Sequence, residues 1–252
     1  MFLNYFSCMP TRREFLSTTA MTTTGIFINA LESYAEPLFS NKAVGFAPII
    51  MATNWGFNGN FDAFGAKAKE AGYDGVEVWL PGDEKSRNEF LQAMQKHSLK
   101  FAFLYGGGDS DPAKHLTQFQ DGVKAALSMK PLYLNCHSGR DHFSFDQNKK
   151  FIEWSYAFAK DSGVPIYHET HRGRILYSAP LSKNYTDSIA DLKLTLDISH
   201  WCAVHESLLG DQGDNVNAAL GRTEHIHARI GHPEGPQVND PRAPEWEGAV
   251  KA

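Results

Sequence analysis

Four reactive side chains follow short apolar runs at a nearly constant interval along the second half of this sequence. His137, Glu169, Asp197 and His227 are separated by 32, 28 and 30 residues. Each closes a run that favours a β-strand. One strand–helix unit takes about 30 residues, and an enzyme barrel of eight such units carries its site at the carboxyl ends of the strands. The spacing therefore predicts a parallel sheet with these four side chains at its functional edge.

The same alternation of apolar runs and helical patterns extends back to residue 44. The predicted strands are Val44–Met51, Gly75–Leu80, Lys100–Leu104, Leu132–Cys136, Pro165–Glu169, Lys193–Ile198 and Glu224–Ile230. The predicted helices are Phe61–Ala71, Glu84–His97, Pro112–Met129, Asp146–Ser162, Tyr177–Asp191 and Asp211–Leu220. A doubly wound open sheet is the alternative, but it should show a G-x-G-x-x-G turn after the first strand, and none is present. We interpret Gly106–Gly108 as a flexible loop over the barrel mouth and not as a phosphate cradle.

The number of units falls short of a full barrel. Eight units need roughly 240 residues, and only 209 remain from Val44 to Ala252. Seven strands are accounted for, and Pro233–Ala252 is rich in proline before a short helical pattern begins. The sequence therefore predicts an α/β protein, a (β/α)8 TIM barrel that is truncated before strand 8 and occupies residues 36–252.

The first 35 residues differ from the rest. Arg12 and Arg13 precede a weakly apolar, threonine-rich stretch, and Ser33-Tyr34-Ala35 is suited to a signal peptidase. This pattern resembles a twin-arginine-type signal peptide, which predicts a periplasmic or otherwise exported protein. An amphipathic first helix is the alternative. The stretch is too short and too polar for a membrane span, so no stable membrane anchor is expected.

Composition narrows the class of protein. The net charge of −5 and the scattered lysines and arginines argue against a nucleic-acid partner. Three cysteines are too few for a disulfide scaffold. We expect Cys136 and Cys202 to be buried thiols, and self-assembly into a homo-oligomer is left open.

Carboxylates and histidines at three successive strand ends favour a metal site. Alone, Asp197 is more typical of a helix cap and His227 of a packed histidine. Together with Glu169 and His200 they suit Mn²⁺, Co²⁺, Mg²⁺ or Zn²⁺ without thiolates. The pattern therefore predicts a divalent metal.

The chain resembles the xylose isomerase-like superfamily over about residues 44–237. The resemblance rests on Ala71–Glu77, on the Glu after strand five, on Asp-x-x-His after strand six and on the His after strand seven. This superfamily includes sugar-phosphate isomerases and epimerases, inosose dehydratases and endonucleases of the AP endonuclease family 2 type.

The resemblance implies roles for individual residues. Glu169 would bind the metal and act as a catalytic acid–base group, with Asp197 and His227 as further ligands. His200 would bind metal or substrate, and Arg229 would hold substrate oxygens. The superfamily's fourth ligand, a Glu on strand eight that is also the second acid–base group, has no counterpart in this chain.

Three further residues are candidates for substrate contact. His137 is favoured as a residue that contacts substrate or supports a metal ligand, over a metal ligand itself. His171, with Arg172, can reach a sugar hydroxyl or carboxylate, or it belongs to a solvated loop. Trp201 either forms an apolar wall for a sugar face or lies in the core.

These features predict a divalent-metal-dependent isomerase or epimerase that moves a proton on a small sugar or polyol through an enediolate. Loss of strand 8 predicts impaired turnover. The alternative is an exported, non-catalytic sugar-binding barrel protein. A DNA-repair nuclease of the same superfamily is opposed by the acidic charge and the incomplete ligand pattern.

Overall fold

The computed structural model describes residues 48–235 and 237–251. The predicted signal peptide, residues 1–35, lies outside them. The chain forms two compact units. The chain leaves the first unit after Glu77, returns to it for residues 83–100 and then continues in the second. Among the described residues, the first unit comprises residues 48–77 and 83–100, and the second comprises residues 78–82 and 101–251.

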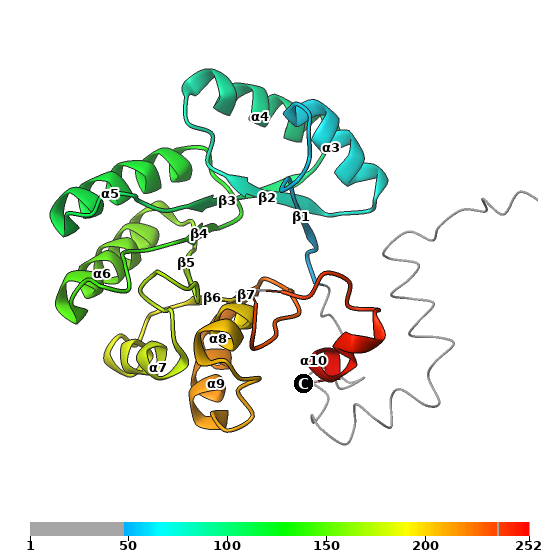
Figure 1. The fold of residues 1–252 in the computed structure, drawn as a ribbon. Helices are drawn as coiled ribbons and strands as arrows, with labels where there is room; N and C mark the ends of the chain where they lie inside the picture. The colour runs from blue at the N-terminus through cyan, green and yellow to red at the C-terminus, as the bar shows by residue number, and fades with distance from the viewer. Residues whose placement is uncertain (1–47, 236, 252) are drawn as a thin grey trace, which may run out of the picture. The chain divides into compact units, whose positions relative to one another are not determined.

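The first unit is built from two strands and two helices. Its elements are β1 (Met51–Thr53), α3 (Phe61–Glu70), β2 (Gly75–Trp79, whose last two residues belong to the second unit) and α4 (Glu84–His97). β1 pairs in parallel with β2, and α3 and α4 lie side by side (Figure 1). Asp62 on α3 joins the helices through Lys96 and His97 at 2.8 and 2.7 Å.

The first strand begins later than predicted. Met51 is the last residue of the predicted strand Val44–Met51 and the first of β1. The backbone N–H of Ile50 donates to the Asp74 carboxylate at 2.9 Å and makes no strand ladder. Residues 44–47 lie outside the described part of the chain. Because the N–H of Ile50 bonds to the Asp74 side chain and not to a neighbouring strand, β1 begins only at Met51.

The second unit contains five strands in parallel register. They are β3 (Lys100–Tyr105, whose first residue belongs to the first unit), β4 (Leu134–Cys136), β5 (Ile166–Glu169), β6 (Leu194–Leu196) and β7 (Thr223–Ile226). Each pairs in parallel with the next along the chain. Parallel neighbours need a crossover connection, which is usually a helix. The predicted strand-helix alternation is therefore confirmed.

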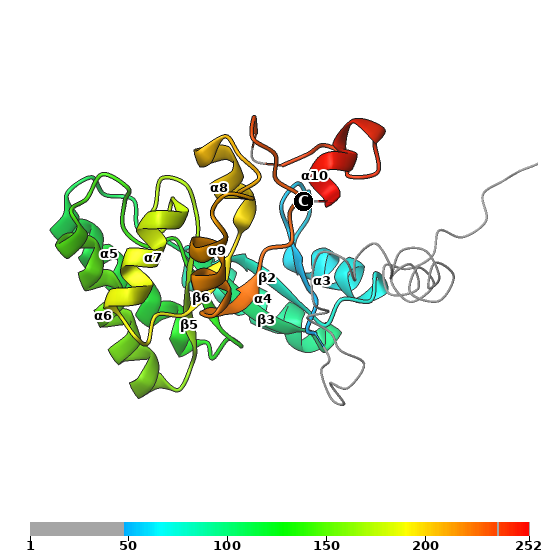
Figure 2. The same cartoon turned by 90° about the horizontal axis from the view of Figure 1, so that it is seen from below.

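Helices connect these strands and cover their outer side. They are α5 (Pro112–Ser128), α6 (Phe145–Ser162), α7 (Ala179–Ser188), α8 (Ile198–His205) and α9 (Gly213–Leu220), followed by η1 (Pro244–Trp246) and α10 (Glu247–Lys251). Figure 2 shows α5, α6 and α7 next to one another along this unit. Phe119 of α5 and Phe151 of α6 are fully buried with their rings edge to face. No helix among the described residues is long and apolar enough to cross a bilayer.

Local sequence explains where the helices begin. Ser144 caps α6 by accepting from the N–H of Gln147, whose side chain accepts in return from the Ser144 N–H. This reciprocal arrangement is a capping box. Asp197 caps α8 by accepting from the backbone N–H and hydroxyl of Ser199 at 3.2 and 2.5 Å.

Helix α8 is absent from the sequence prediction, which extended the sixth strand to Ile198. That prediction was wrong, because β6 ends at Leu196 and α8 starts two residues later. Apolar and aromatic residues are spread around the segment Ile198–His205 without forming an amphipathic stripe. Its sequence therefore gave no helical signal. The seventh strand likewise ends at Ile226 and not at Ile230.

Candidate functional site

The parallel register brings the predicted strand-end residues to one edge of the second unit. Glu169 is the last residue of β5, and His137, Asp197 and His227 each directly follow β4, β6 and β7. The carboxyl ends of parallel strands lie at the same edge of a sheet, where barrel enzymes place their sites. We name Glu169, Asp197, His137, His200 and His227 the strand-end cluster.

Glu169 lies at the centre of this cluster. It is 3% exposed, and its Oε2 accepts from His137 Nε2 at 2.9 Å and from Asn135 Nδ2 at 2.7 Å. His227 Nδ1 lies 3.5 Å from Oε1. The Asn135 amide also donates to His227 Nε2 at 3.3 Å, so a neutral His227 carries its proton on Nδ1, facing the carboxylate.

The donors around Glu169 keep it ionised. Burial alone would raise the pKa of this carboxyl, but hydrogen bonds from His137 and His227 outweigh burial. The pKa of Glu169 therefore lies well below its ordinary value. At neutral pH the group is a buried carboxylate, suited to binding a cation.

Asp197 has two roles in the structure. Besides capping α8, its Oδ2 accepts from Arg229 Nε at 2.8 Å and lies 2.5 Å from Arg229 Nη2. Arg229 Nη2 also donates to His200 Nε2 at 2.6 Å. Asp197 can therefore cap α8 and also take part in the site, because its Oδ1 accepts from Ser199 and its Oδ2 accepts from Arg229.

Two of the histidines around the carboxylates, His200 and His171, are held neutral. Burial, followed by the charges of His171 and Arg229, lowers the pKa of His200 to about 2. Burial and the charge of His137 lower the pKa of His171 to about 4. The His171 ring lies 4.1 Å from that of His137 and 3.9 Å from that of His200. A neutral imidazole has a free lone pair, as a metal ligand requires.

The cluster suits a divalent cation. Ligand atoms of Glu169, Asp197 and His200 lie within 4.8 Å of one another, and all three residues are buried. A second group of the same size joins His137, Glu169 and His171. His200 Nε2 is the ring nitrogen that faces the carboxylates, 3.9 Å from Glu169 Oε1 and 3.8 Å from Asp197 Oδ2. Two buried carboxylates with neutral imidazoles form a donor set for Mn²⁺, Co²⁺, Mg²⁺ or Zn²⁺.

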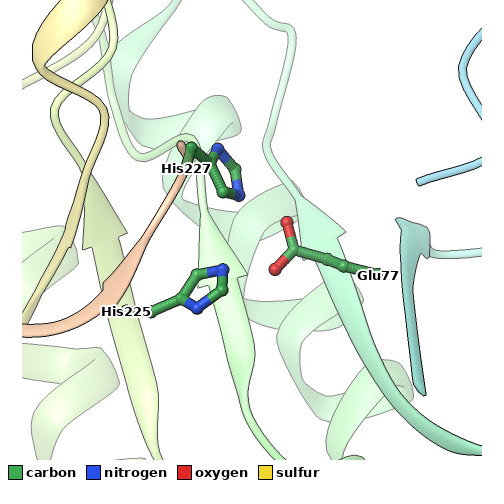
Figure 3. Close-up of side chains that lie close together, drawn as sticks. All are labelled: Glu77, His225 and His227. Carbon is green, nitrogen blue, oxygen red and sulfur yellow. The ribbon is translucent and has the colours of Figure 1, made fainter. Parts of the chain in front are cut away.

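The end of β7 presents two histidines on one side. Figure 3 shows His225 and His227 projecting to the same side of β7, and Ile226 between them is 59% exposed. His225 Nε2 lies 3.1 Å from the hydroxyl of Tyr133. Glu77, also drawn in Figure 3, is a buried carboxylate on β2 of the first unit. Because side chains alternate between the two faces of a strand, the sequence predicted that His225 and His227 would point to the same side.

Trp201 is not part of the cluster. Its side chain is fully buried, and its indole N–H donates to the backbone oxygen of Leu176 at 2.9 Å. Of the two interpretations from sequence, the core placement is the one found. Trp79 is instead 43% exposed, with its ring 5.2 Å from that of His137 and perpendicular to it.

Sequence reasoning missed Asn135 and Trp79. Asn135 is separated by one residue from His137, so strand alternation could have placed both on one face. No comparable signal identified Trp79. Cys136 and Cys202 are both buried free thiols, as expected, and burial raises the pKa of each.

The buried side chain of His168 makes the stability of the second unit depend on pH. It is 4% exposed, and its Nδ1 accepts from the Ser138 hydroxyl at 2.7 Å while its Nε2 donates to the Ser155 hydroxyl at 2.9 Å. Burial lowers its pKa from 6.5 to about 4. The unfolded chain therefore binds a proton more readily, so this stability is present above pH 6.5 and lost as the pH falls toward 4.

We expect this group to contribute about 3 kcal/mol to the free energy of unfolding at neutral pH. Urea unfolding at pH 7.5 and pH 4.5 measures the loss. His168→Gln should flatten the pH dependence, and His142→Gln, on an exposed side chain, should leave it unchanged. An unaltered slope in His168→Gln would show that the histidine is not buried in neutral form.

Comparison with known proteins identifies the family. The model of the family described as xylose isomerase-like TIM barrel matches residues 66–244. The chain belongs to the xylose isomerase-like TIM barrel family. The matched segment runs from α3 to η1 and includes every member of the strand-end cluster. A search of curated protein sequences finds no match.

Several solved structures share this fold. A probable 3-DHS dehydratase from Bacillus anthracis is 15% identical with a TM-score of 0.57, covering 77% of this chain and 78% of that chain. The 3-keto-D-glucoside 4-epimerase from E. coli is 18% identical with a TM-score of 0.53, covering 72% and 78%. A xylose isomerase-like TIM barrel protein from Mycobacterium smegmatis, in complex with magnesium, is 11% identical with a TM-score of 0.55, covering 72% and 74%. At these identities the likeness establishes the fold.

The predicted fold class is thereby confirmed. Family membership and the seven strands of the described residues agree with a (β/α) barrel of the xylose isomerase-like type. Residues 48–235 and 237–251 contain no eighth strand.

Proposed function

We propose that the protein is a divalent-metal-dependent isomerase or epimerase that acts on a small sugar or sugar derivative. The observation that carries the proposal is Glu169, a buried and ionised carboxylate at a strand end, adjacent to a second carboxylate and neutral histidines. Members of the same fold include a 3-keto-D-glucoside 4-epimerase and a probable 3-DHS dehydratase. Chemistry at a carbon next to a carbonyl is common to such enzymes.

Glu169, Asp197 and His227 would hold the metal, with His200 beside them. A divalent cation bound there supplies Lewis-acid stabilisation of negative charge on substrate oxygens. A structure with the same fold contains magnesium, which supports a divalent metal but not the choice of ligands.

Glu169 is the proposed base. Its carboxylate takes the proton of the carbon next to the substrate carbonyl, the C–H electron pair moves into the carbon–oxygen system, and an enediolate forms. Hydrogen bonds from His137 and Asn135 orient the carboxylate. Arg229 and His171 would contact substrate oxygens at the mouth of the site. Isomerisation or solvent exchange, in which the proton returns to the same face, requires only Glu169, whereas epimerisation requires a second proton donor on the opposite face.

Exchange with solvent tests this proposal on the chain as it is. In D₂O with Mn²⁺, a panel of ketoses, ketose derivatives and inositols is incubated with the protein and analysed by proton NMR. We expect loss of one carbon-bound proton signal in the accepted substrate, and no loss after metal removal with EDTA. Exchange by a metal-free sample, or by no member of the panel, would contradict the proposal.

A non-catalytic sugar-binding protein is the second candidate. It is favoured by the exposed ring of Trp79, which can stack on a sugar face, and by the occupation of Asp197 with Arg229. Apart from Asp197, the strand-end cluster contains no carboxylate that could act beside Glu169 as a second acid–base group. Sugar binding without metal, unchanged in Glu169→Gln, would favour this candidate. Export through the signal at residues 1–35 stays a prediction.

A further inference from the structure

Two arginines beside the strand-end cluster have no acidic partner. Arg174 Nη1 donates to the backbone oxygens of Gly107 and Gly139 at 3.1 and 3.4 Å. Arg140 Nη2 donates to the backbone oxygen of Gly108 at 3.2 Å. Among the described residues, no carboxylate lies within 4.0 Å of either guanidinium. Each guanidinium has five N–H groups, so most of these donors have no acceptor in the part of the chain that the structure describes.

The loops that carry this pair are fixed in place. Asn148 is 1% exposed, and its amide donates to the backbone oxygen of Arg140 at 2.7 Å while its Oδ1 accepts from the Arg140 N–H at 3.3 Å. Gly139 has a φ of +50°, and a side chain there would overlap the Asn148 side chain. A Cβ on Gly106 would lie 2.7 Å from the backbone oxygen of His137. The Arg140 loop is therefore fixed by packed backbone, and Arg174 is joined to it through the hydrogen bond to Gly139.

The two positive charges act on each other and on the site. Burial and then the charge of Arg140 lower the pKa of Arg174 to about 10, while the charges of Glu169 and Asp141 act in the opposite direction. Arg174 in turn helps to lower the pKa of His171. Both residues are only partly exposed. Among the described residues neither arginine has a carboxylate at ion-pair distance, and two neighbouring cations of this kind at the edge of a site favour a negatively charged ligand.

We propose that Arg140 and Arg174 bind an acidic group of the substrate, a carboxylate or a phosphate. This inference rests on the proposed function, because the acidic group would belong to the molecule that reaches Glu169. Guanidinium groups recognise carboxylate and phosphate through paired charge-assisted hydrogen bonds. The substrate is therefore a sugar acid or a sugar phosphate, and a neutral sugar is a poor ligand.

Binding of matched ligands tests this inference without turnover. Calorimetric titrations of metal-free protein use D-fructose, D-fructose 6-phosphate, D-glucose, D-glucuronate and inorganic phosphate. We expect the acidic sugars to bind at least about tenfold more tightly than their neutral partners. Preference for the phosphate identifies a sugar phosphate substrate, and preference for the glucuronate identifies a sugar acid.

Variants separate ligand binding from loop structure. Arg140→Gln with Arg174→Gln should abolish the preference for acidic ligands while leaving neutral ligands unchanged. Lys150→Gln with Lys160→Gln, two exposed positions of α6, changes the net charge equally and should keep the preference. A thermal unfolding scan checks that the variants fold, and Arg174→Lys provides a milder replacement.

Equal binding of acidic and neutral partners by the wild-type protein would overturn the inference, as would a preference that survives both arginine replacements. Absence of binding by all acidic probes would overturn it too. Solvent exchange is measured separately. A preference for acids without exchange would contradict the proposed function alone, and exchange on a neutral sugar would contradict this inference alone.

Discussion

Glu169→Gln is expected to slow solvent exchange at the substrate carbon by a factor of about 10² to 10⁴. Glutamine keeps the size of the side chain but cannot accept a proton, and a positioned acid–base group contributes about this factor. The carboxylate is buried and surrounded by donors that hold it ionised. Proton NMR in D₂O with saturating Mn²⁺ measures the exchange rate.

The matched control is Glu153→Gln on α6, which removes one carboxylate from an exposed position. It should exchange at the wild-type rate. If Glu169→Gln kept more than about a tenth of that rate, the base would have to be another group.

Asp197→Ala is expected to lower the free energy of unfolding by about 3–5 kcal/mol. The substitution removes the buried carboxylate that pairs with Arg229 and the acceptor that caps α8. It thus leaves a partly buried guanidinium without its anion, and a helix start without its cap. Urea unfolding followed by circular dichroism measures the change.

Asp197→Asn separates the two roles of this residue. Its amide oxygen can still accept from Ser199, so the cap should survive and the loss of stability should be smaller than in the alanine variant. The charge pair with Arg229 is lost in both variants. Equal destabilisation by Asn and Ala would show that the charge pair alone matters, and wild-type stability in both would contradict the packing described for Asp197.

The strand-end residues could be predicted because residues that recur at a constant interval in the sequence lie at the same edge of the sheet. In parallel strand–helix units, residues one period apart fall at the same edge. His137, Glu169, Asp197 and His227 all lie at or directly after a strand end. Alternation along the strand likewise placed His225 and His227 on one side.

The remaining features depend on contacts that no local pattern encodes. Helix α8 begins where Asp197 accepts from Ser199, and its apolar residues gave no amphipathic signal. Arg140 and Arg174 lie on loops, and their meeting depends on the turns around Gly139 and Gly107. Trp201 can lie in the core because its indole N–H donates a hydrogen bond to the backbone oxygen of Leu176. Side-chain partners of this kind come from tertiary structure.

Manganese titration followed by electron paramagnetic resonance tests the central claim most directly. We expect one tightly bound Mn²⁺ per chain, and we expect Glu169→Gln and Asp197→Asn each to weaken binding by at least about a hundredfold, while Glu153→Gln binds as the wild type does. Equal affinity in all four proteins, or no bound Mn²⁺ in the wild type, would contradict a metal site at the strand-end cluster.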